Sequence, residues 1–476
     1  MSRERLPQHV ACPVRSAAER CGGAVAISSP EENLTFSELD ATVTGMAGKI
    51  LLCGLGGERV GIYSEKSAAR IALIFALIRS GSVAAPISTR IPPDEAPEML
   101  FRAGCSSLVS DFPEALRAAR DKGLETFIPE KLTGPENAAP GPDPPEIPLA
   151  RPATVVFTSG STGAPRAALH TFGNHYANAV GSSKNIPLAP GDIWLHSLPL
   201  FHVGGLSILF RCVRAGATIA LPGPDETPGE ALRKSGATHV SLVATQLLRS
   251  LEAGEDLSGA RAILLGGSAV PSGLLDRAFG AGLSVHTSYG LTEMASQVTT
   301  TRPGADRAEL ATSGRVLPHR ELRISGGGEI LVRGETLFAG YAGRDGTASP
   351  LDPDGWFHTK DLGYLDESGL LTVTGRLDNL FISGGENIQP EEVEEELRRL
   401  AGVVDAVVVP VADREFGERP VAFVKAKALR SDLDERLRRK LPGFKVPAAF
   451  FDWPDDAPQG MKLDRAFFRR RAAELR

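Results

Sequence analysis

The stretch TSGSTGAPRAALHT, residues 158–171, brings small hydroxyl side chains and two closely spaced glycines together directly after the apolar run TVVF. Glycine exposes backbone N–H groups, hydroxyls add further donors, and Arg166 supplies a positive charge, so the loop could hold a chain of phosphates. The spacing is not that of a Walker A loop, which requires G-x-x-x-x-G-K-[ST]. Taken alone, a Ser/Gly-rich loop is more often a plain surface turn, so the phosphate interpretation needs support from elsewhere in the chain.

Later segments carry residues that suit nucleotide chemistry: YGLTE at 289–293, TKDLGY at 359–364, GRLDNLFISGGENI at 375–388 and PQGMKLDR at 458–465. A carboxylate such as Glu293 is a hard oxygen ligand of the kind that Mg²⁺ takes when it bridges phosphates. Asp361 could accept both hydroxyl hydrogens of a ribose. Each residue alone also has a structural explanation, since Glu293 could be a first-turn acid of a helix and Asp361 a turn residue before glycine.

Two further residues are unusual for their surroundings. His202 lies between apolar residues in PLFHVGG, where a histidine is either a hydrogen-bonded core residue or a group that faces a ligand. Arg211 lies inside the apolar run LSILFRCV, and a buried guanidinium needs a polar or anionic partner. That partner is either a carboxylate of the protein or an acidic substrate.

The elements around these motifs are typical of a layered α/β protein. From residue 35 to 110, helical patterns such as FSELDATVTGMAGKILL alternate with short strands such as RVGIYS and VAAPI. Later buried-strand patterns end in glycine or small polar residues: TVVFTSG, HVSLVAT, AILLGGS and SVHTSYG. The carboxyl ends of such strands are where α/β proteins bind ligands, so the chemistry-bearing loops should meet at one edge. Residues 129–152 are so rich in proline that we expect no regular element there.

The pattern changes past residue 320 and predicts a second domain. ELRISGGGEILVRG and GLLTVTGRLDNLFISGG are typical of antiparallel hairpins. A charged segment follows, with predicted helices at PEEVEEELRRL and LDERLRRKL and predicted strands at DAVVVPV and VAFVKAKA. We therefore predict an α/β fold with a large N-terminal domain of layered α/β subdomains, residues 1–377, and a small mobile C-terminal α+β domain, residues 378–476.

Composition excludes several classes of protein. The 476 residues carry a formal net charge of −6, which argues against general nucleic-acid binding and still allows a local basic pocket. The longest apolar run, IALIFALI at 71–78, is too short to span a bilayer. The five cysteines form no CxxC pair and the N-terminus lacks the apolar core of a signal peptide, so we expect a cytoplasmic protein with reduced thiols. The sequence leaves the oligomeric state open, a homo-oligomer included.

The set of motifs resembles the adenylate-forming superfamily of acyl-CoA ligases, non-ribosomal adenylation domains and luciferases. The phosphate loop and the four later segments occur in the order typical of that family, and the resemblance spans nearly the whole chain. Separate structural explanations would require each of these matches to be a coincidence. Within the superfamily, LHSLPLFHVGGLSILFRCVRAGATI, ILLGGSAVP, TSYGLTEMASQVTT and the short chain are similar to the o-succinylbenzoate–CoA ligases of menaquinone biosynthesis.

The resemblance implies a role for each matched residue. The β- and γ-phosphates of ATP would be held by Thr158, Ser159, Gly160, Ser161, Thr162 and Gly163, with Arg166 beside them. The adenine would be bordered by Gly266, Gly267, Ser268 and Ala269 and would stack on Tyr289. The other nucleotide and metal assignments are Thr292 to the α-phosphate, Glu293 to Mg²⁺, and Asp361 and Arg376 to the ribose hydroxyls. The remaining assignments are Asp378 to the hinge, Gly384 and Gly385 to the pantetheine tunnel of coenzyme A, His202 and Gly267 to the acyl pocket, and Lys462 to catalysis.

Two departures from the family pattern concern charge and backbone. The family usually has lysine and then glycine after the loop proline, whereas Arg166 and Ala167 follow Pro165 here. Arginine keeps the positive charge on a rigid fork in place of a flexible point charge. Lys462 stands in PQGMK and not directly after glycine. These changes bear on catalytic rate more than on reaction class.

The resemblance implies a two-step ligase that adenylates a carboxylic acid and then transfers the acyl group to coenzyme A. The implied substrates are ATP, coenzyme A and an acid, with Mg²⁺ as cofactor. Because o-succinylbenzoate has two carboxylates and only one is activated, we hypothesise that Arg211 attracts the other, directly or through water. Open alternatives are an aryl- or medium-chain acyl-CoA ligase, an enzyme that loads a carrier-protein thiol, and a nucleotide-binding protein without catalysis.

Overall fold

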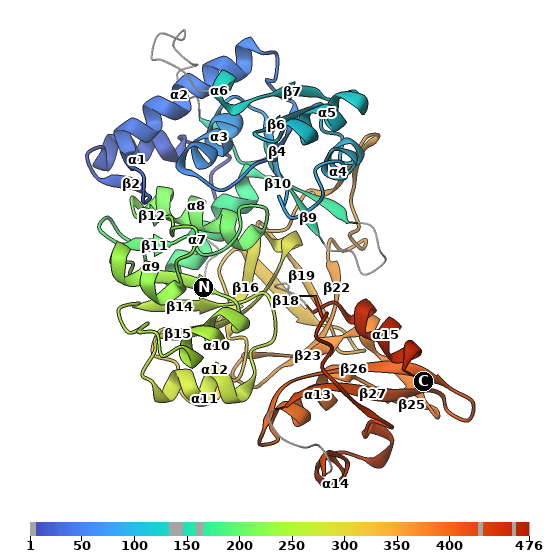
Figure 1. The fold of residues 1–476 in the computed structure, drawn as a ribbon. Helices are drawn as coiled ribbons and strands as arrows, with labels where there is room; N and C mark the ends of the chain where they lie inside the picture. The colour runs from blue at the N-terminus through green and yellow to red at the C-terminus, as the bar shows by residue number, and fades with distance from the viewer. Residues whose placement is uncertain (1–5, 133–145, 159–164, 427–431, 459–462, 476) are drawn as a thin grey trace.

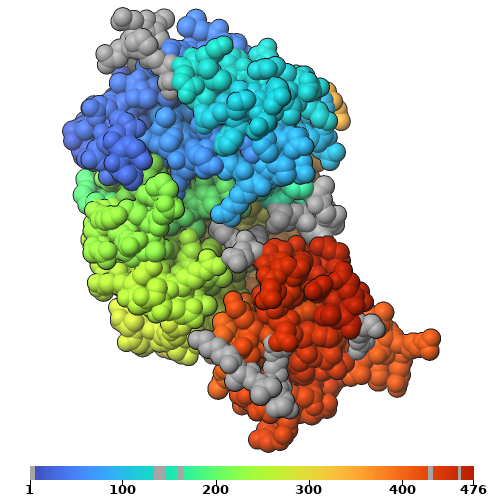
Figure 2. Space-filling model, in the orientation of Figure 1, coloured from blue at the N-terminus to red at the C-terminus, as the bar shows by residue number. Residues whose placement is uncertain are grey.

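The computed structural model describes residues 6–132, 146–158, 165–426, 432–458 and 463–475. Two large sheets and a smaller one make up the N-terminal body, and a further sheet lies near the C-terminus (Figure 1). In the space-filling view, the orange-to-red C-terminal residues form a distinct lobe beside that body (Figure 2). The mixed α/β fold predicted from the sequence is confirmed.

The first large sheet has parallel strands at its centre and an antiparallel extension. Its strands, in spatial order, are β21 (Gly346–Ala348), β20 (Gly340–Gly343), β10 (Arg166–Thr171), β9 (Pro152–Thr158), β5 (Val83–Pro86), β4 (Arg59–Tyr63), β6 (Ser107–Ser110) and β7 (Glu125–Phe127). Helices that follow its strands are α3 (Ala68–Arg79), α4 (Ala96–Arg102), α5 (Pro113–Asp121) and α6 (Pro129–Leu132). The parallel βαβ units explain why the strand sequences are continuously apolar.

The second large sheet is parallel from β2 to β15 and antiparallel at both edges. In spatial order its strands are β17 (Arg315–Val316), β16 (Ser296–Thr300), β15 (Val285–Leu291), β14 (Ala262–Leu265), β13 (His239–Leu242), β11 (Ile193–Leu195), β12 (Thr218–Ala220), β2 (Val25–Ser28) and β3 (Asn33–Thr35). Its helices are α7 (Phe172–Asn185), α8 (Val203–Ala215), α9 (Pro228–Ser235), α10 (Ala244–Glu252), α11 (Ser272–Gly280) and α12 (Arg307–Leu310). A 3₁₀ turn, η1 (Thr292–Met294), separates β15 from β16.

One continuous apolar core joins the two large sheets. It contains Val60 from β4, Trp194 from β11 and side chains of α1 (Pro13–Cys21), α2 (Phe36–Leu52), α3, α7 and α8. Helix α2 begins at a capping box in which the Thr35 hydroxyl and the Glu38 carboxylate satisfy each other's backbone N–H groups. Because these helices face both sheets, a shift of one sheet against the other would open this core.

The chain then forms two smaller antiparallel-rich sheets. The four-stranded sheet contains β18 (Arg320–Ile324), β19 (Glu329–Gly334), β22 (Phe357–Leu365) and β23 (Leu371–Arg376). After the turn η2 (Leu377–Asn379), the C-terminal sheet contains β24 (Phe381–Ser383), β25 (Glu386–Ile388), β26 (Val403–Asp413), β27 (Gly417–Ala426) and β28 (Phe450–Asp452). Its helical elements are α13 (Pro390–Arg398), α14 (Leu433–Arg438), η3 (Gly443–Lys445) and α15 (Arg465–Glu474). The C-terminal elements have apolar cores of their own on the two faces of β26 and β27.

Two expectations about local structure are wrong. GLLTVTGRLDNLFISGG is not one hairpin, because β23 pairs with β22 whereas β24 pairs with β25 and β27. The proline-rich segment contains short regular pieces, namely α6 and β8 (Ile147–Pro148), which pairs with β1 (His9–Val10). Proline tolerates both positions, because it suits the first turn of a helix and the edge of a sheet. In the part of the chain that the structure describes, no helix is long and apolar enough to cross a bilayer.

Candidate active site

Strands β9 and β10 hold the two ends of the predicted phosphate loop together. Thr158 is paired with Arg166 in the antiparallel ladder, and the Thr158 hydroxyl donates to the Arg166 carbonyl at 3.4 Å. Residues 159–163 of that prediction, Ser159, Gly160, Ser161, Thr162 and Gly163, lie outside the described residues. The Arg166 guanidinium carbon lies 4.2 Å from the centre of the Tyr341 ring. The base of the loop is therefore a hairpin whose last strand leads directly into the body of the site.

Thr292 and Glu293 lie on η1, a turn that neighbouring strands hold from several sides. His170 on β10 bonds through Nε2 to the Thr292 carbonyl at 2.7 Å, and the Phe338 amide donates to the Glu293 carbonyl at 2.8 Å. Burial lowers the pKa of His170 to about 4, so the ring is neutral and its Nε2 carries the donated hydrogen. The next residue, Ala295, has a φ of 53°, so the turn is held in a backbone conformation that non-glycine residues rarely adopt.

The Glu293 carboxylate faces a tyrosine. Its Oε1 accepts a hydrogen bond of 2.6 Å from the Tyr341 hydroxyl, and the Glu293 residue is only 7% exposed. Burial, followed by the Glu293 charge, raises the pKa of Tyr341, so the phenol stays protonated and donates. A single carboxylate near a phosphate loop suits Mg²⁺, which in nucleotide sites takes one or two protein carboxylates and otherwise phosphate oxygens and water.

Tyr289, Asp361 and Arg376 form one hydrogen-bonded cluster. The Tyr289 hydroxyl donates to Asp361 Oδ2 at 2.6 Å, and the Arg376 guanidinium contacts Asp361 Oδ1 at 2.5 Å. Asp361 and Arg376 are directly opposite each other on β22 and β23, and β15 brings Tyr289 to them. Burial, followed by the Asp361 charge, raises the pKa of Tyr289 well above its usual value. Three motifs that are far apart in the sequence therefore meet as a polar patch of the size of a ribose.

The predicted adenine border follows the carboxyl end of β14. Gly266 is partly buried, and Gly267, Ser268 and Ala269 are exposed immediately after that strand. Gly267 has a φ of +87°, which only glycine adopts readily, and a Cβ on Gly266 would lie 3.0 Å from the Ser288 hydroxyl. The border, η1 and the end of β9 all follow strand carboxyl ends, which is the ligand edge expected of an α/β fold.

His202 lies at the N-terminus of α8, and its ring centre is 4.6 Å from that of Phe201. The close turn before the helix depends on Gly205, because a Cβ there would lie 2.1 Å from the Pro199 carbonyl oxygen. The same helix carries Arg211 two turns further on. His202 and Arg211 are thus presented by a single rigid element, as an acyl-pocket wall requires.

Arg211 is 3% exposed and has no carboxylate partner among the residues that the structure describes. Its Nη2 donates to the Asn178 side-chain oxygen at 3.2 Å, its guanidinium lies 5.4 Å from the Trp194 ring centre, and its Nε is unpaired. Burial lowers the pKa of Arg211 to about 10, which still leaves it charged at neutral pH. The structural alternative of a protein carboxylate is therefore not met within those residues.

A second buried arginine, Arg320, lies close to Arg211. Its guanidinium donates to the carbonyls of Gln297 at 2.6 Å and Pro318 at 2.7 Å. Burial, followed by the positive charge of Arg211, lowers the pKa of Arg320 to about 9. Two guanidinium groups without a carboxylate partner in the described chain make this region of the interior favourable to an anion.

The predicted hinge and tunnel residues lie at the junction to the C-terminal sheet. Asp378 on η2 is contacted by the Lys360 ammonium at 3.1 Å and by the Arg376 guanidinium at 3.6 Å. Gly384 and Gly385 form the turn between β24 and β25, with φ values of +57° and +86°. Positive φ at both central residues is the requirement of a type I′ hairpin turn, so this geometry alone demands glycine. A Cβ on Gly384 would meet the Phe416 ring at 2.7 Å, whereas a Cβ on Gly385 would meet nothing within 4 Å. Lys462 lies outside the described residues.

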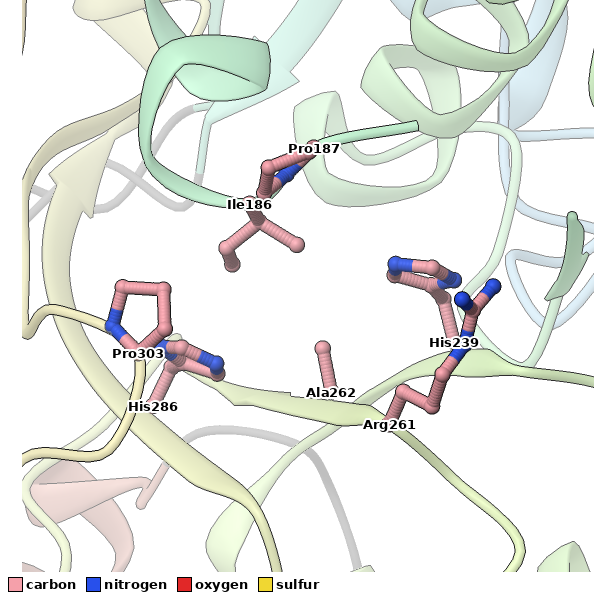
Figure 3. A pocket seen from close by; sticks show the side chains of 7 residues that line it. All are labelled: Ile186, Pro187, His239, Arg261, Ala262, His286 and Pro303. Carbon is pink, nitrogen blue, oxygen red and sulfur yellow. The ribbon is translucent and has the colours of Figure 1, made fainter. Parts of the chain in front are cut away.

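A cavity of about 210 Å³ opens at the opposite edge of the second large sheet (Figure 3). It is lined by Ile186, Pro187, His239, Arg261, Ala262, His286 and Pro303. His239, Ala262 and His286 all lie at the amino ends of parallel strands. Because the candidate site uses the carboxyl ends, this cavity is not the substrate pocket.

Comparison with known proteins decides the family. A family model described as AMP-binding enzyme matches residues 14–342, and one described as AMP-binding enzyme C-terminal domain matches residues 392–458. The chain belongs to the AMP-binding enzyme family. The superfamily resemblance found in the motifs is thereby confirmed.

Similar members of the AMP-binding family share one printed activity. The 2-succinylbenzoate–CoA ligase of Bacillus cereus (strain Q1) is 35% identical over 439 residues, covering 89% of this chain and 90% of that protein. The o-succinylbenzoate CoA synthetase (MenE) of Bacillus subtilis, solved with the acyl-adenylate intermediate OSB-AMP, is 30% identical with a TM-score of 0.87, covering 97% and 98% of the chains. E. coli MenE with bound OSB-AMS is 31% identical with a TM-score of 0.84, covering 99% and 100%.

Sequence reasoning about this AMP-binding enzyme missed Tyr341 and His170. Both residues act on η1 from strands of the other large sheet, β20 and β10. Only the pairing of Ala168 with Tyr341 brings these distant segments together. The signal available in the sequence was weak: a tyrosine in FAGYAG and a histidine two residues before an expected core phenylalanine.

Proposed function

We propose that this AMP-binding enzyme is an ATP-dependent acid–CoA ligase and that its acid is o-succinylbenzoate. The observation that carries the choice of acid is Arg211, a charged group buried in α8 without a carboxylate partner among the described residues. A dicarboxylic acid supplies that partner with the carboxylate that is not activated. The similar proteins named as 2-succinylbenzoate–CoA ligases support the same choice.

In the proposed first step, one substrate carboxylate attacks the α-phosphorus of ATP and pyrophosphate leaves. Asp361 and Arg376 orient the ribose, and Tyr289 provides the stacking surface for adenine. Glu293 would hold Mg²⁺, which supplies charge neutralisation on the phosphates when it is bound. The loop of residues 158–163 and Arg166 hold the outgoing phosphates, and Thr292 contacts the α-phosphate. Catalysis in this step is positioning plus electrostatic stabilisation.

In the proposed second step, the coenzyme A thiol attacks the acyl-adenylate and AMP leaves. Residues 378–476 rotate about Asp378, so that Lys462 withdraws and the turn at Gly384 and Gly385 lines the path of the pantetheine. The Lys360 and Arg376 contacts to Asp378 offer a defined set of charges that such a rotation would break or remake. His202 gates the acyl pocket between the two steps.

The proposed setting is the cytoplasm, since none of the five cysteines is disulfide-bonded and three of them are buried. Among the described residues, no group of three potential protein ligands for a metal is present. A site of one carboxylate plus substrate phosphates needs no such group.

Acid-dependent exchange of pyrophosphate into ATP, measured without coenzyme A, tests the proposal against its alternatives. We expect exchange with o-succinylbenzoate, abolished by Glu293→Gln. Absence of exchange with every acid would leave a nucleotide-binding protein without catalysis. Exchange that is followed by AMP release only when a carrier protein is supplied, and not coenzyme A, would identify the carrier-loading alternative.

A further inference from the structure

The Glu293 carboxylate is held by one neutral side chain. Tyr341 Oη donates to Glu293 Oε1 at 2.6 Å, and within the described residues no other side chain bonds to that carboxylate. No lysine or arginine is paired with Glu293 there either. A phenol that donates to one oxygen fixes the carboxylate rotamer and leaves the other oxygen available, without bringing a positive charge that would repel a cation.

The tyrosine itself is held in place from two directions. The Ala168–Tyr341 pairing of β10 with β20 sets its backbone, and the Phe338 ring packs edge-on at a centroid distance of 4.9 Å. Arg166, two residues before Ala168 on β10, covers the Tyr341 ring at 4.2 Å. A guanidinium over an aromatic face at this distance is an attractive cation–π contact.

These contacts join two parts of the site that are far apart in the chain. Arg166 is the first residue of β10 after the phosphate loop, and Glu293 lies on η1 of the other large sheet. The path runs from Arg166 to the Tyr341 ring, and from the Tyr341 hydroxyl to the carboxylate. Arginine stands here where the family usually has lysine, and a planar guanidinium stacks on a ring better than an ammonium does.

We propose that Tyr341 is a positioning residue that sets Glu293 for Mg²⁺ and, through Arg166, couples the metal carboxylate to the phosphate loop. This inference rests on the proposed function, in which Glu293 holds the metal. Loss of a hydrogen bond to a metal-ligating carboxylate weakens metal affinity by about 10- to 100-fold in proteins. The Tyr341 hydroxyl is therefore required for metal-dependent ATP binding, and the ring is required for the contribution of Arg166.

The test is the Mg²⁺ concentration that gives half-maximal binding of a non-hydrolysable ATP analogue to the full chain, measured by calorimetry without acid. Tyr341→Phe keeps the ring and removes the hydroxyl, and should raise that concentration by about 10-fold or more. AMP affinity in the presence of a chelator and the melting temperature should stay close to those of the unsubstituted chain. Tyr364→Phe, the same change at an exposed tyrosine of β22, is the matched control and should alter nothing.

Two outcomes separate this inference from the proposed function. A Glu293→Gln variant that binds the analogue with unchanged Mg²⁺ dependence would overturn the metal assignment and the positioning role with it. If Glu293→Gln removes the dependence but Tyr341→Phe leaves the half-maximal concentration unchanged, only the positioning role of Tyr341 is wrong.

A double-substitution cycle tests the coupling to Arg166. Arg166→Gln should weaken metal-dependent analogue binding strongly in the Tyr341→Phe background, where the ring remains. In a Tyr341→Leu background its effect should be smaller, because the contact between the two side chains is already lost. Equal effects in both backgrounds would show that Arg166 acts on the phosphates alone and would overturn the coupling.

Discussion

Arg211 and Arg320 show how differently two buried guanidinium groups can be satisfied. Arg320 donates to backbone carbonyls of Gln297 and Pro318, which is a structural arrangement. Arg211 has one side-chain amide, one aromatic face and an unpaired Nε. The hydrogen-bonding capacity that Arg211 retains is what a substrate carboxylate would use.

Arg211→Leu is expected to raise the KM for o-succinylbenzoate by about 10²-fold, because a charged hydrogen bond in a buried site is lost. The KM for a monocarboxylic aryl acid should change much less. Steady-state kinetics with both acids measure the difference.

Arg320→Leu is the matched control, since it removes a neighbouring buried guanidinium that has only structural contacts. It should lower the melting temperature and affect both acids alike. Equal losses on both acids in Arg211→Leu would make Arg211 structural as well.

Among the elements, the β24–β25 hairpin has two separable demands for glycine. Positive φ at Gly384 and Gly385 is needed to form the turn, and a narrow thiol path would be a further reason to exclude side chains. In the described conformation a side chain at Gly385 meets nothing within 4 Å, so folding does not exclude one there.

Gly385→Asn separates these demands, because asparagine tolerates a left-handed backbone. If the turn enters the coenzyme A path after domain rotation, thioester formation from synthetic acyl-adenylate should slow by about 10-fold or more. Adenylation and the melting temperature should stay near those of the parent. Unchanged thioester formation would leave the glycines with a role in the turn only.

Helix α2 and the hairpin around β24 show which elements the sequence predicts well. The helix over FSELDATVTGMAGKILL is read correctly because Thr35 and Glu38 form a local capping box. GLLTVTGRLDNLFISGG is misread because both of its strands look alike locally, while their partners, β22 and β27, lie elsewhere in the chain. Strand β8 pairs with a segment more than a hundred residues away, which no local pattern reveals.

The candidate site divides in the same way. Asp361, Arg376 and Tyr289 were found because each belongs to a motif with its own chemistry, and the structure joins them by hydrogen bonds. Tyr341 and Arg320 were missed because their partners are set by strand pairing and packing between sheets. Spacing along the chain carries information on motifs and little on the contacts between them.

For the whole molecule, the proposed rotation of the C-terminal domain predicts that Lys462 matters in one step only. Lys462→Ala should slow adenylation by about 10²-fold or more, since one charge stabiliser is lost. Thioester formation from synthetic acyl-adenylate and coenzyme A should remain near normal. Rapid-quench measurement of each half-reaction decides: equal losses in both steps would contradict the rotation, and no loss in either would contradict the assignment of Lys462.

The folded chain should also be sensitive to acid, because burial lowers the pKa of several histidines: His170, His175, His196, His239 and His286. Below the usual histidine pKa of 6.5, the unfolded chain takes up protons that these folded side chains do not. Stability is therefore present above pH 6.5 and falls as the pH decreases toward 4, by about 2 kcal/mol per such histidine between pH 7 and 5.

His196→Gln checks this pH dependence at the histidine whose pKa burial lowers to about 3. Glutamine does not titrate, and its amide can donate to the Gly205 carbonyl that His196 contacts at 3.1 Å. Denaturant unfolding at pH 7 and pH 5 should show a smaller loss of stability in this variant than in the parent. An equal loss would mean that His196 does not contribute to the acid sensitivity.

The central claim is that this chain joins o-succinylbenzoate to coenzyme A at the expense of ATP. The most direct test is a coupled AMP-release assay with coenzyme A over o-succinylbenzoate, benzoate and mid-length fatty acids, with the thioester identified by mass. We predict the highest kcat/KM for o-succinylbenzoate and a product that retains one free carboxylate. A higher kcat/KM for benzoate or a fatty acid, or AMP release without a coenzyme A thioester, would contradict the claim.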